Sequence, residues 1–154
     1  MPDDLVAAYL AAGAGRGATI VVLGATSEAL RLALVESTGA TGLVIVCEPN
    51  PEPAANRRVA RVRAAPTSAP IASHIADLVL LTMLTAADLD AITDEARRLL
   101  APRGDLRAAL PAATADADAL VPSVTRALTA ASFRTIEISE IAGAGVLSIR
   151  ARGP

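Results

Sequence analysis

Short runs of apolar residues alternate along the chain with segments in which apolar positions recur every three or four residues. A short continuous apolar run is typical of a strand buried on both faces, whereas the longer spacing indicates an amphipathic helix. The runs predict strands at residues 19–23, 43–47, 61–64, 77–83 and 105–110. The longer spacing predicts helices at residues 5–10 and within residues 116–131. Capping residues define three more helices, from the N-cap Ser27 to Gly39, from Pro53 through Arg58, and from Thr85 or Asp88 to Pro102.

The pattern changes near the end of the chain. Residues 133–141 and 146–151 alternate apolar and polar side chains, which is typical of strands with one exposed face. The turn at residues 143–145 is so short that it can join only antiparallel neighbours. We therefore predict an α/β three-layer sandwich whose mostly parallel sheet carries an antiparallel C-terminal hairpin. The length of 154 residues and the lack of a linker favour one domain over residues 1–154.

Composition narrows the chemistry that this chain can perform. All 14 basic residues are arginine, so a Schiff-base lysine and a P-loop lysine are both excluded. The aromatic residues are Tyr9 and Phe133, too few for an aromatic cage or a base-stacking platform. A net charge of -2 gives no support for binding nucleic acid or a membrane surface. We expect a protein partner rather than either of these.

The polar and reactive residues outside the strands give no clear site. Cys47 is the only cysteine and is expected to be an inert, buried side chain, and no metal site is expected. His74 is expected on a surface loop, and Met83 in the core. The acidic start of the chain and the lack of a long apolar run predict a cytoplasmic protein. The cluster of Arg57, Arg58, Arg61 and Arg63 forms either a solvated face or a surface for an acidic partner.

Several segments together resemble the class I S-adenosylmethionine-dependent methyltransferases. The segments are residues 20–24 (IVVLG), 44–48 (VIVCE), 76–81 (ADLVLL), 99–106 (LLAPRGDL), 131–134 (ASFR) and 143–149 (GAGVLSI). They match that family's first strand and glycine loop, the acid that ends its second strand, its fourth strand, the entry to its fifth strand, and its terminal hairpin. The resemblance covers nearly the whole chain and implies a Rossmann-like, seven-stranded sheet.

The same resemblance implies five cofactor-binding candidates. Gly24 would contact the amino-acid end of S-adenosylmethionine, and Glu48 would accept hydrogen bonds from the ribose hydroxyls. The alternative for Glu48 is a solvated acid at the end of a strand. Thr67 or Ser68 would border the adenine, and Thr82 follows the fourth strand.

The chain departs from the family pattern at the cofactor loop. Val22 stands where the family has an acid, and Thr26 and Glu28 stand where it has glycines. These side chains would crowd the pocket, and Glu28 would add negative charge beside the cofactor's carboxylate. Residues 82–85 (TMLT) replace the polar or aromatic stretch that many members use in catalysis, so no residue is predicted to be catalytic.

Two functions follow from these departures. The first is a non-catalytic methyltransferase-like domain, a pseudoenzyme without a cofactor that acts as a protein-interaction or assembly module. It resembles the N-terminal domain of anamorsin-type iron–sulfur cluster assembly factors, which implies a setting in that assembly. The second is a small methyltransferase with S-adenosylmethionine as cofactor, because methyl transfer depends mainly on alignment and does not require a base.

Overall fold

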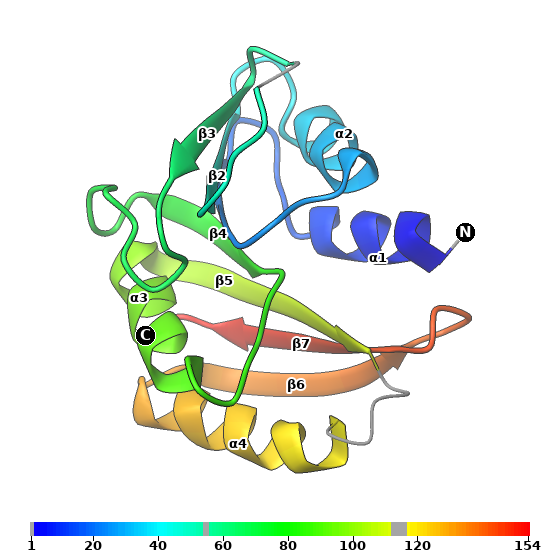
Figure 1. Ribbon diagram of the computed structural model, residues 1–154, viewed down its shortest axis with the longest axis vertical. Helices are drawn as coiled ribbons and strands as arrows, with labels where there is room; N and C mark the ends of the chain where they lie inside the picture. The colour runs from blue at the N-terminus through cyan, green and yellow to red at the C-terminus, as the bar shows by residue number, and fades with distance from the viewer. Residues whose placement is uncertain (1, 54–55, 112–116) are drawn as a thin grey trace.

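A seven-stranded sheet lies between two layers of helices in the computed structural model, which describes residues 2–53, 56–111 and 117–154 (Figure 1). The strand order is β3-β2-β1-β4-β5-β7-β6. The strands are β1 (Thr19–Leu23), β2 (Leu43–Glu48), β3 (Val59–Arg63), β4 (Ala76–Leu81), β5 (Leu100–Pro111), β6 (Arg134–Ile141) and β7 (Val146–Arg152). The predicted α/β sandwich with a mostly parallel sheet is thus confirmed.

The first five strands in chain order are parallel, and β1 at their centre is buried from both sides. In β1, Ile20 and Val22 face one helix layer, whereas Val21 and Leu23 face the other, and all four are fully buried. Burial on both faces explains why this strand is a continuous apolar run without alternation. Strands β2 and β4 flank β1 on either side in parallel register. The carboxyl ends of these three strands therefore lie side by side.

The helices pair off on the two faces of the sheet. Helices α1 (Pro2–Ala11) and α2 (Glu28–Thr38) cover one face, and α3 (Leu89–Leu99) and α4 (Ala117–Ala130) cover the other (Figure 1). The predicted N-cap of α2 is confirmed, since Ser27 Oγ accepts a hydrogen bond of 3.1 Å from the Leu30 amide. Within the described residues, none of the helices combines the length and apolar character needed to cross a bilayer.

The C-terminal hairpin has the predicted antiparallel pairing. Strand β7 runs antiparallel to both of its neighbours, β5 and β6. Strand β6 lies at the edge of the sheet, and its side chains alternate between half-buried isoleucines and exposed polar groups. The alternation read from the sequence is therefore the signature of a sheet edge that only one helix layer covers.

One predicted helix and the predicted start of one strand are wrong. The helix predicted from Pro53 through Arg58 is not formed by residues 51–53 or 56–58, while residues 54 and 55 lie outside the described part of the chain. A local turn competes there, because Asn56 Oδ1 accepts a 2.9 Å bond from the Arg58 amide. The fifth strand was predicted to begin at Asp105, but β5 begins at Leu100 directly after α3. Leu100 aligns with Ala76 of β4, and Arg103 (φ 65°) accommodates the irregular register that follows.

Candidate functional site

Three of the five predicted cofactor residues lie at the adjacent carboxyl ends of β1, β2 and β4. The Gly24 amide donates a 2.9 Å hydrogen bond to the carbonyl of Cys47, which precedes Glu48. The Thr82 amide donates a 3.3 Å bond to the carbonyl of Leu23, which precedes Gly24. In open α/β sheets, ligands bind along this carboxyl edge. We therefore take the edge formed by Gly24, Glu48 and Thr82 as the candidate site.

The space above Gly24 is filled by Thr82. Gly24 has a φ of +119°, which side chains rarely adopt, and an added Cβ would overlap the Thr82 hydroxyl and lie 3.4 Å from the Met83 amide nitrogen. The Thr82 hydroxyl is also 3.4 Å from the carbonyl oxygen of Leu23. The packing of β4 against β1 is thus sufficient to require glycine here. Met83 itself is 52% exposed, so the prediction that it packs in the core is wrong.

Hydrogen bonds within residues 26–31 hold the loop from β1 to α2 against the start of the helix. Ser27 caps the helix through the Leu30 amide. Arg31 Nη1 donates to Thr26 twice, at 2.7 Å to the carbonyl oxygen and at 3.0 Å to Oγ1. The loop is therefore held by side-chain bonds that include Thr26, one of the two positions where the resembling family has glycines.

Glu48 is buried and forms an ion pair with Arg61 of β3. Its Oε1 accepts a 2.8 Å bond from Arg61 Nε and a second bond from Arg61 Nη2. Both side chains are 7% exposed. Glu48 Oε2 accepts no hydrogen bond from the residues that the structure describes. The alternative of a solvated acid is thus wrong for Glu48, and half of its accepting capacity remains available.

Arg61 is the site residue that sequence reasoning missed. It was grouped with the neighbouring arginines as a surface cluster, although it lies on the same face of β3 as the buried Val59. Position 61 follows position 59 by two residues, which is a recognisable signal for a shared face in a strand. The register that aligns Arg61 with Val46, two residues before Glu48, could be learned only from the structure.

Thr67 and Ser68 lie on the loop between β3 and β4, which begins where the Ala64 amide donates a 3.1 Å bond to the Glu48 carbonyl. The Ser68 amide bonds to the carbonyl of Ala65 at 3.0 Å and closes a tight turn. The two residues line neither of the cavities described below, and whether they would border an adenine stays a prediction. His74 lies farther along this connection, at the amino end of β4, with Nδ1 3.1 Å from the Leu100 carbonyl oxygen. It is therefore remote from the candidate site.

A second glutamate–arginine pair anchors this connection to α3. Glu95 Oε1 accepts 2.8 Å from the Ala69 amide and 2.6 Å from Arg98 Nη2, while Oε2 accepts 2.8 Å from Arg98 Nε. Arg98 also donates to the carbonyls of Ala69 and Ile71. The Arg98 hydrogen bonds hold the pKa of Glu95 below its ordinary value. Burial, and then the charge of Glu95, raise the pKa of the Cys47 thiol to about 11.

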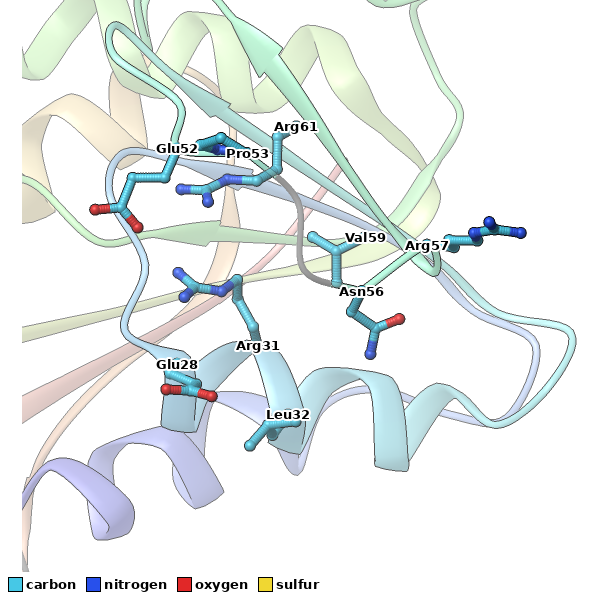
Figure 2. Close-up of a pocket in the computed structure, with 9 residues that line it drawn as sticks. All are labelled: Glu28, Arg31, Leu32, Glu52, Pro53, Asn56, Arg57, Val59 and Arg61. Carbon is cyan, nitrogen blue, oxygen red and sulfur yellow. The ribbon is translucent and has the colours of Figure 1, made fainter.

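Two cavities lie near the candidate site. A cavity of about 360 Å³ lies between α1, the start of α2 and the ends of β4 and β5. Its lining is mostly apolar, with Ser27 and Thr82 among the polar members. A cavity of about 570 Å³ lies on the other side of the α2 N-terminus, between α2, β3 and the residues after β2 (Figure 2). Gly24 and Glu48 line neither cavity, so the predicted cofactor residues do not share one formed pocket.

No protein-family model matches the sequence, and no curated protein matches it. Solved structures match at low identity. Fibrillarin from Aeropyrum pernix, with bound S-adenosylmethionine, has a TM-score of 0.76 at 14% identity and is matched over 96% of this chain and 73% of its own. A Thermotoga maritima S-adenosylmethionine-dependent O-methyltransferase has a TM-score of 0.74 at 16% identity, over 98% of this chain and 64% of its own. An Aquifex aeolicus S-adenosylmethionine-dependent methyltransferase has a TM-score of 0.72 at 15% identity. The match covers 90% of this chain and 83% of the Aquifex chain.

The fold is that of the class I methyltransferases. The strand order and the reversed β7 both fit this fold. The chain spans less than two thirds of the length of the Thermotoga enzyme. At these identities the similarity defines the fold alone, and activity has to be argued from the site.

Proposed function

We propose that this chain is a non-catalytic methyltransferase-like domain that serves as a protein-interaction or assembly module. The observation that carries this proposal is the ion pair between Glu48 and Arg61. A carboxylate that binds a ribose diol accepts hydrogen bonds from its hydroxyls. Here one oxygen already accepts two bonds from a guanidinium, whose charge neutralises the acid.

The neighbouring groups support the same proposal. The Thr82 hydroxyl occupies the approach to Gly24, and the loop from β1 to α2 is tied down by Ser27 and Arg31. A cofactor would therefore displace bonds that the chain makes with itself, and their replacement lowers the net gain on binding. We propose iron–sulfur cluster assembly as the first setting to test, on the strength of the sequence resemblance alone.

A small S-adenosylmethionine-dependent methyltransferase is the second candidate. The observation that favours it is Glu48 Oε2, which has no partner among the described residues and could accept a ribose hydroxyl while Arg61 orients the carboxylate. Gly24 would contact the amino-acid end of the cofactor, and Thr67 or Ser68 would border the adenine. The cavity beside Thr82 offers room for a methyl acceptor.

Titration calorimetry with S-adenosylmethionine and S-adenosylhomocysteine separates the two candidates. We expect no measurable heat at millimolar ligand for the wild-type protein. Binding tighter than about 100 μM that is lost in Glu48→Ala overturns the non-catalytic proposal, provided that Glu36→Ala still binds. Glu36 is a suitable control because it is an exposed acid on α2. Circular dichroism confirms that each variant is folded.

A further inference from the structure

The larger cavity has the size and position of a separate ligand site. It measures about 570 Å³ and lies between the first turns of α2 and the outer strand β3. Small-molecule sites commonly measure about 300–1,000 Å³. Its lining comes from α2, from β3, and from residues 52, 53, 56 and 57 between β2 and β3.

Two guanidinium groups enter this cavity from opposite walls. Arg31 reaches in from α2 and Arg61 from β3, and their side chains point toward the same space in Figure 2. Arg61 uses Nε and Nη2 to bind Glu48, and Arg31 uses Nη1 to bind Thr26. Within the described residues, Nη1 of Arg61 and Nε and Nη2 of Arg31 donate no hydrogen bond. Each arginine is thus fixed by one partner and retains donors for another.

The rest of the lining is mixed in character. Leu32 is 56% exposed on α2 and, with Val59, offers apolar surface to the cavity. Glu28 and Glu52 also line it, and neither forms an ion pair with another described residue. The cavity therefore combines cationic donors, anionic acceptors and an apolar wall. Such a set fits a ligand that carries an anionic group, hydroxyl groups and a carbon skeleton together.

We propose that this cavity binds a phosphate monoester of a small hydroxylated molecule. The three terminal oxygens of a phosphate monoester can accept from both guanidiniums at once, whereas a carboxylate offers two oxygens. The hydroxyl groups donate to Glu28 and Glu52, and the carbon skeleton packs on Leu32 and Val59. None of the five predicted cofactor residues lines this cavity, so the site is distinct from the predicted S-adenosylmethionine site, to which Arg61 connects it through Glu48.

Titration of the wild-type protein with ribose 5-phosphate tests the ligand class directly. The probes are the ¹⁵N side-chain signals of arginine in a heteronuclear NMR spectrum. We expect the Nε signals of Arg31 and Arg61 to shift together, with binding at least about 10-fold tighter than for inorganic phosphate, because only the monoester brings sugar hydroxyl groups and a carbon skeleton. Equal binding of the two ligands overturns the assignment, and so does the absence of any shift at millimolar ribose 5-phosphate.

Arg31→Met and Arg63→Met form a matched pair of variants. Both remove one guanidinium, but Arg63 is an exposed residue of β3 that does not line the cavity. We expect Arg31→Met to weaken binding by about 10-fold or more and Arg63→Met to change it by less than about 2-fold. If both variants weaken ribose 5-phosphate binding equally, the loss comes from the overall charge of the protein rather than from this cavity, and the proposal is overturned. Arg61 is left intact, because its removal would leave Glu48 unpaired and affect folding.

A further variant covers the case in which Arg31→Met does not fold, since Arg31 also holds Thr26. Glu28→Gln removes an acceptor charge at the start of α2, where the side chain is exposed and forms no ion pair with the described residues. We expect this variant to lower the ratio of the affinity for ribose 5-phosphate to the affinity for inorganic phosphate. An unchanged preference overturns the role of Glu28 as a hydroxyl acceptor and, with it, the assigned ligand class.

Discussion

The two glutamate–arginine pairs differ in how many of their hydrogen-bonding atoms have partners. Glu95 accepts hydrogen bonds on both oxygens, and Arg98 spreads its remaining donors over the carbonyls of the loop between β3 and β4. Glu48 accepts on one oxygen only, and Arg61 keeps one nitrogen without a partner in the described part of the chain. The first pair joins a helix to a loop, whereas the second joins two adjacent strands at the candidate site.

This difference separates a structural pair from one that can still bind. A buried charged group gains most when every donor and acceptor is used, because each unused group carries the full cost of leaving water. The Glu95–Arg98 pair meets that condition and fixes a connection that has no helix of its own. The Glu48–Arg61 pair does not, and Arg61, which keeps an unused donor, lines the larger cavity, where a ligand or water can reach it.

The largest expected effect comes from Glu95→Gln. The amide cannot accept on both of its terminal atoms, so Arg98 loses a partner and the Ala69 amide competes for the remaining oxygen. We expect the free energy of unfolding to fall by about 2 kcal/mol, below the value for a fully buried pair because Arg98 is 35% exposed. Urea unfolding measures it. An unchanged midpoint contradicts the structural role of this pair.

The pH dependence of the free energy of unfolding tests whether the charge of Glu95 stabilises the fold. The pKa of Glu95 is lowered in the folded state from its ordinary value of 4.5, so its stabilising contribution is complete above that pH. The contribution is lost as the pH falls from 4.5 through the lower pKa of the folded state. Urea unfolding of the wild type and of Glu95→Gln should therefore give a difference that shrinks below pH 4.5. A constant difference down to pH 3 would show that the charge of Glu95 does not contribute.

Glu48→Gln should lower the free energy of unfolding by less than Glu95→Gln does. The amide oxygen of glutamine can replace Oε1, which is the only oxygen of Glu48 that Arg61 uses. We expect a loss of about 1 kcal/mol in the same urea assay. The exposed Glu140→Gln is the control for both variants and should change stability by less than about 0.5 kcal/mol. If Glu48→Gln is the more damaging variant, the contrast between the two pairs is wrong.

The smallest effect concerns Cys47, which lies beside Glu48 in sequence but responds to Glu95. Its pKa of about 11 is due first to burial and second to the Glu95 charge. Glu95→Gln should lower this pKa, whereas Glu48→Gln should leave it unchanged. The pH at which the S–H stretching band of the thiol disappears from the Raman spectrum measures it in the folded protein. A shift of the Cys47 pKa in the Glu48 variant alone would show that Glu48, and not Glu95, is the charge that raises it.

Most of the fold could be predicted because local pattern and tertiary packing agree. The apolar run in β1 and the alternation in β6 identify a central strand and an edge strand, and Ser27 marks the start of α2. The errors lie where tertiary contacts override local signals. Pro53 favours a helix start, yet the Asn56 side chain closes a turn instead. Residues 102–104 carry breaker signals, yet pairing with β4 extends β5 back to Leu100.

The candidate site was predicted only in part. Gly24, Glu48 and Thr82 follow strands that are neighbours in the sheet, so their proximity follows from the predicted topology. The Glu48–Arg61 pair depends on the register between β2 and β3, which a short connection and an arginine-rich strand leave open. The approach of Thr82 to Gly24 depends on how closely β4 packs against β1. Both are tertiary details that residue types alone do not specify.

The place of β7 in the sheet has a consequence for the way the chain is made. Strand β7 is inserted between β5 and β6, although it follows both of them in the sequence. During synthesis the pairing edge of β5, residues 105–111, stays open until β7 has left the ribosome. A nascent chain that already has its parallel strands and helices α1–α4 would still expose this edge. A stalled or truncated chain is then prone to aggregate through β5, and the finished chain is not.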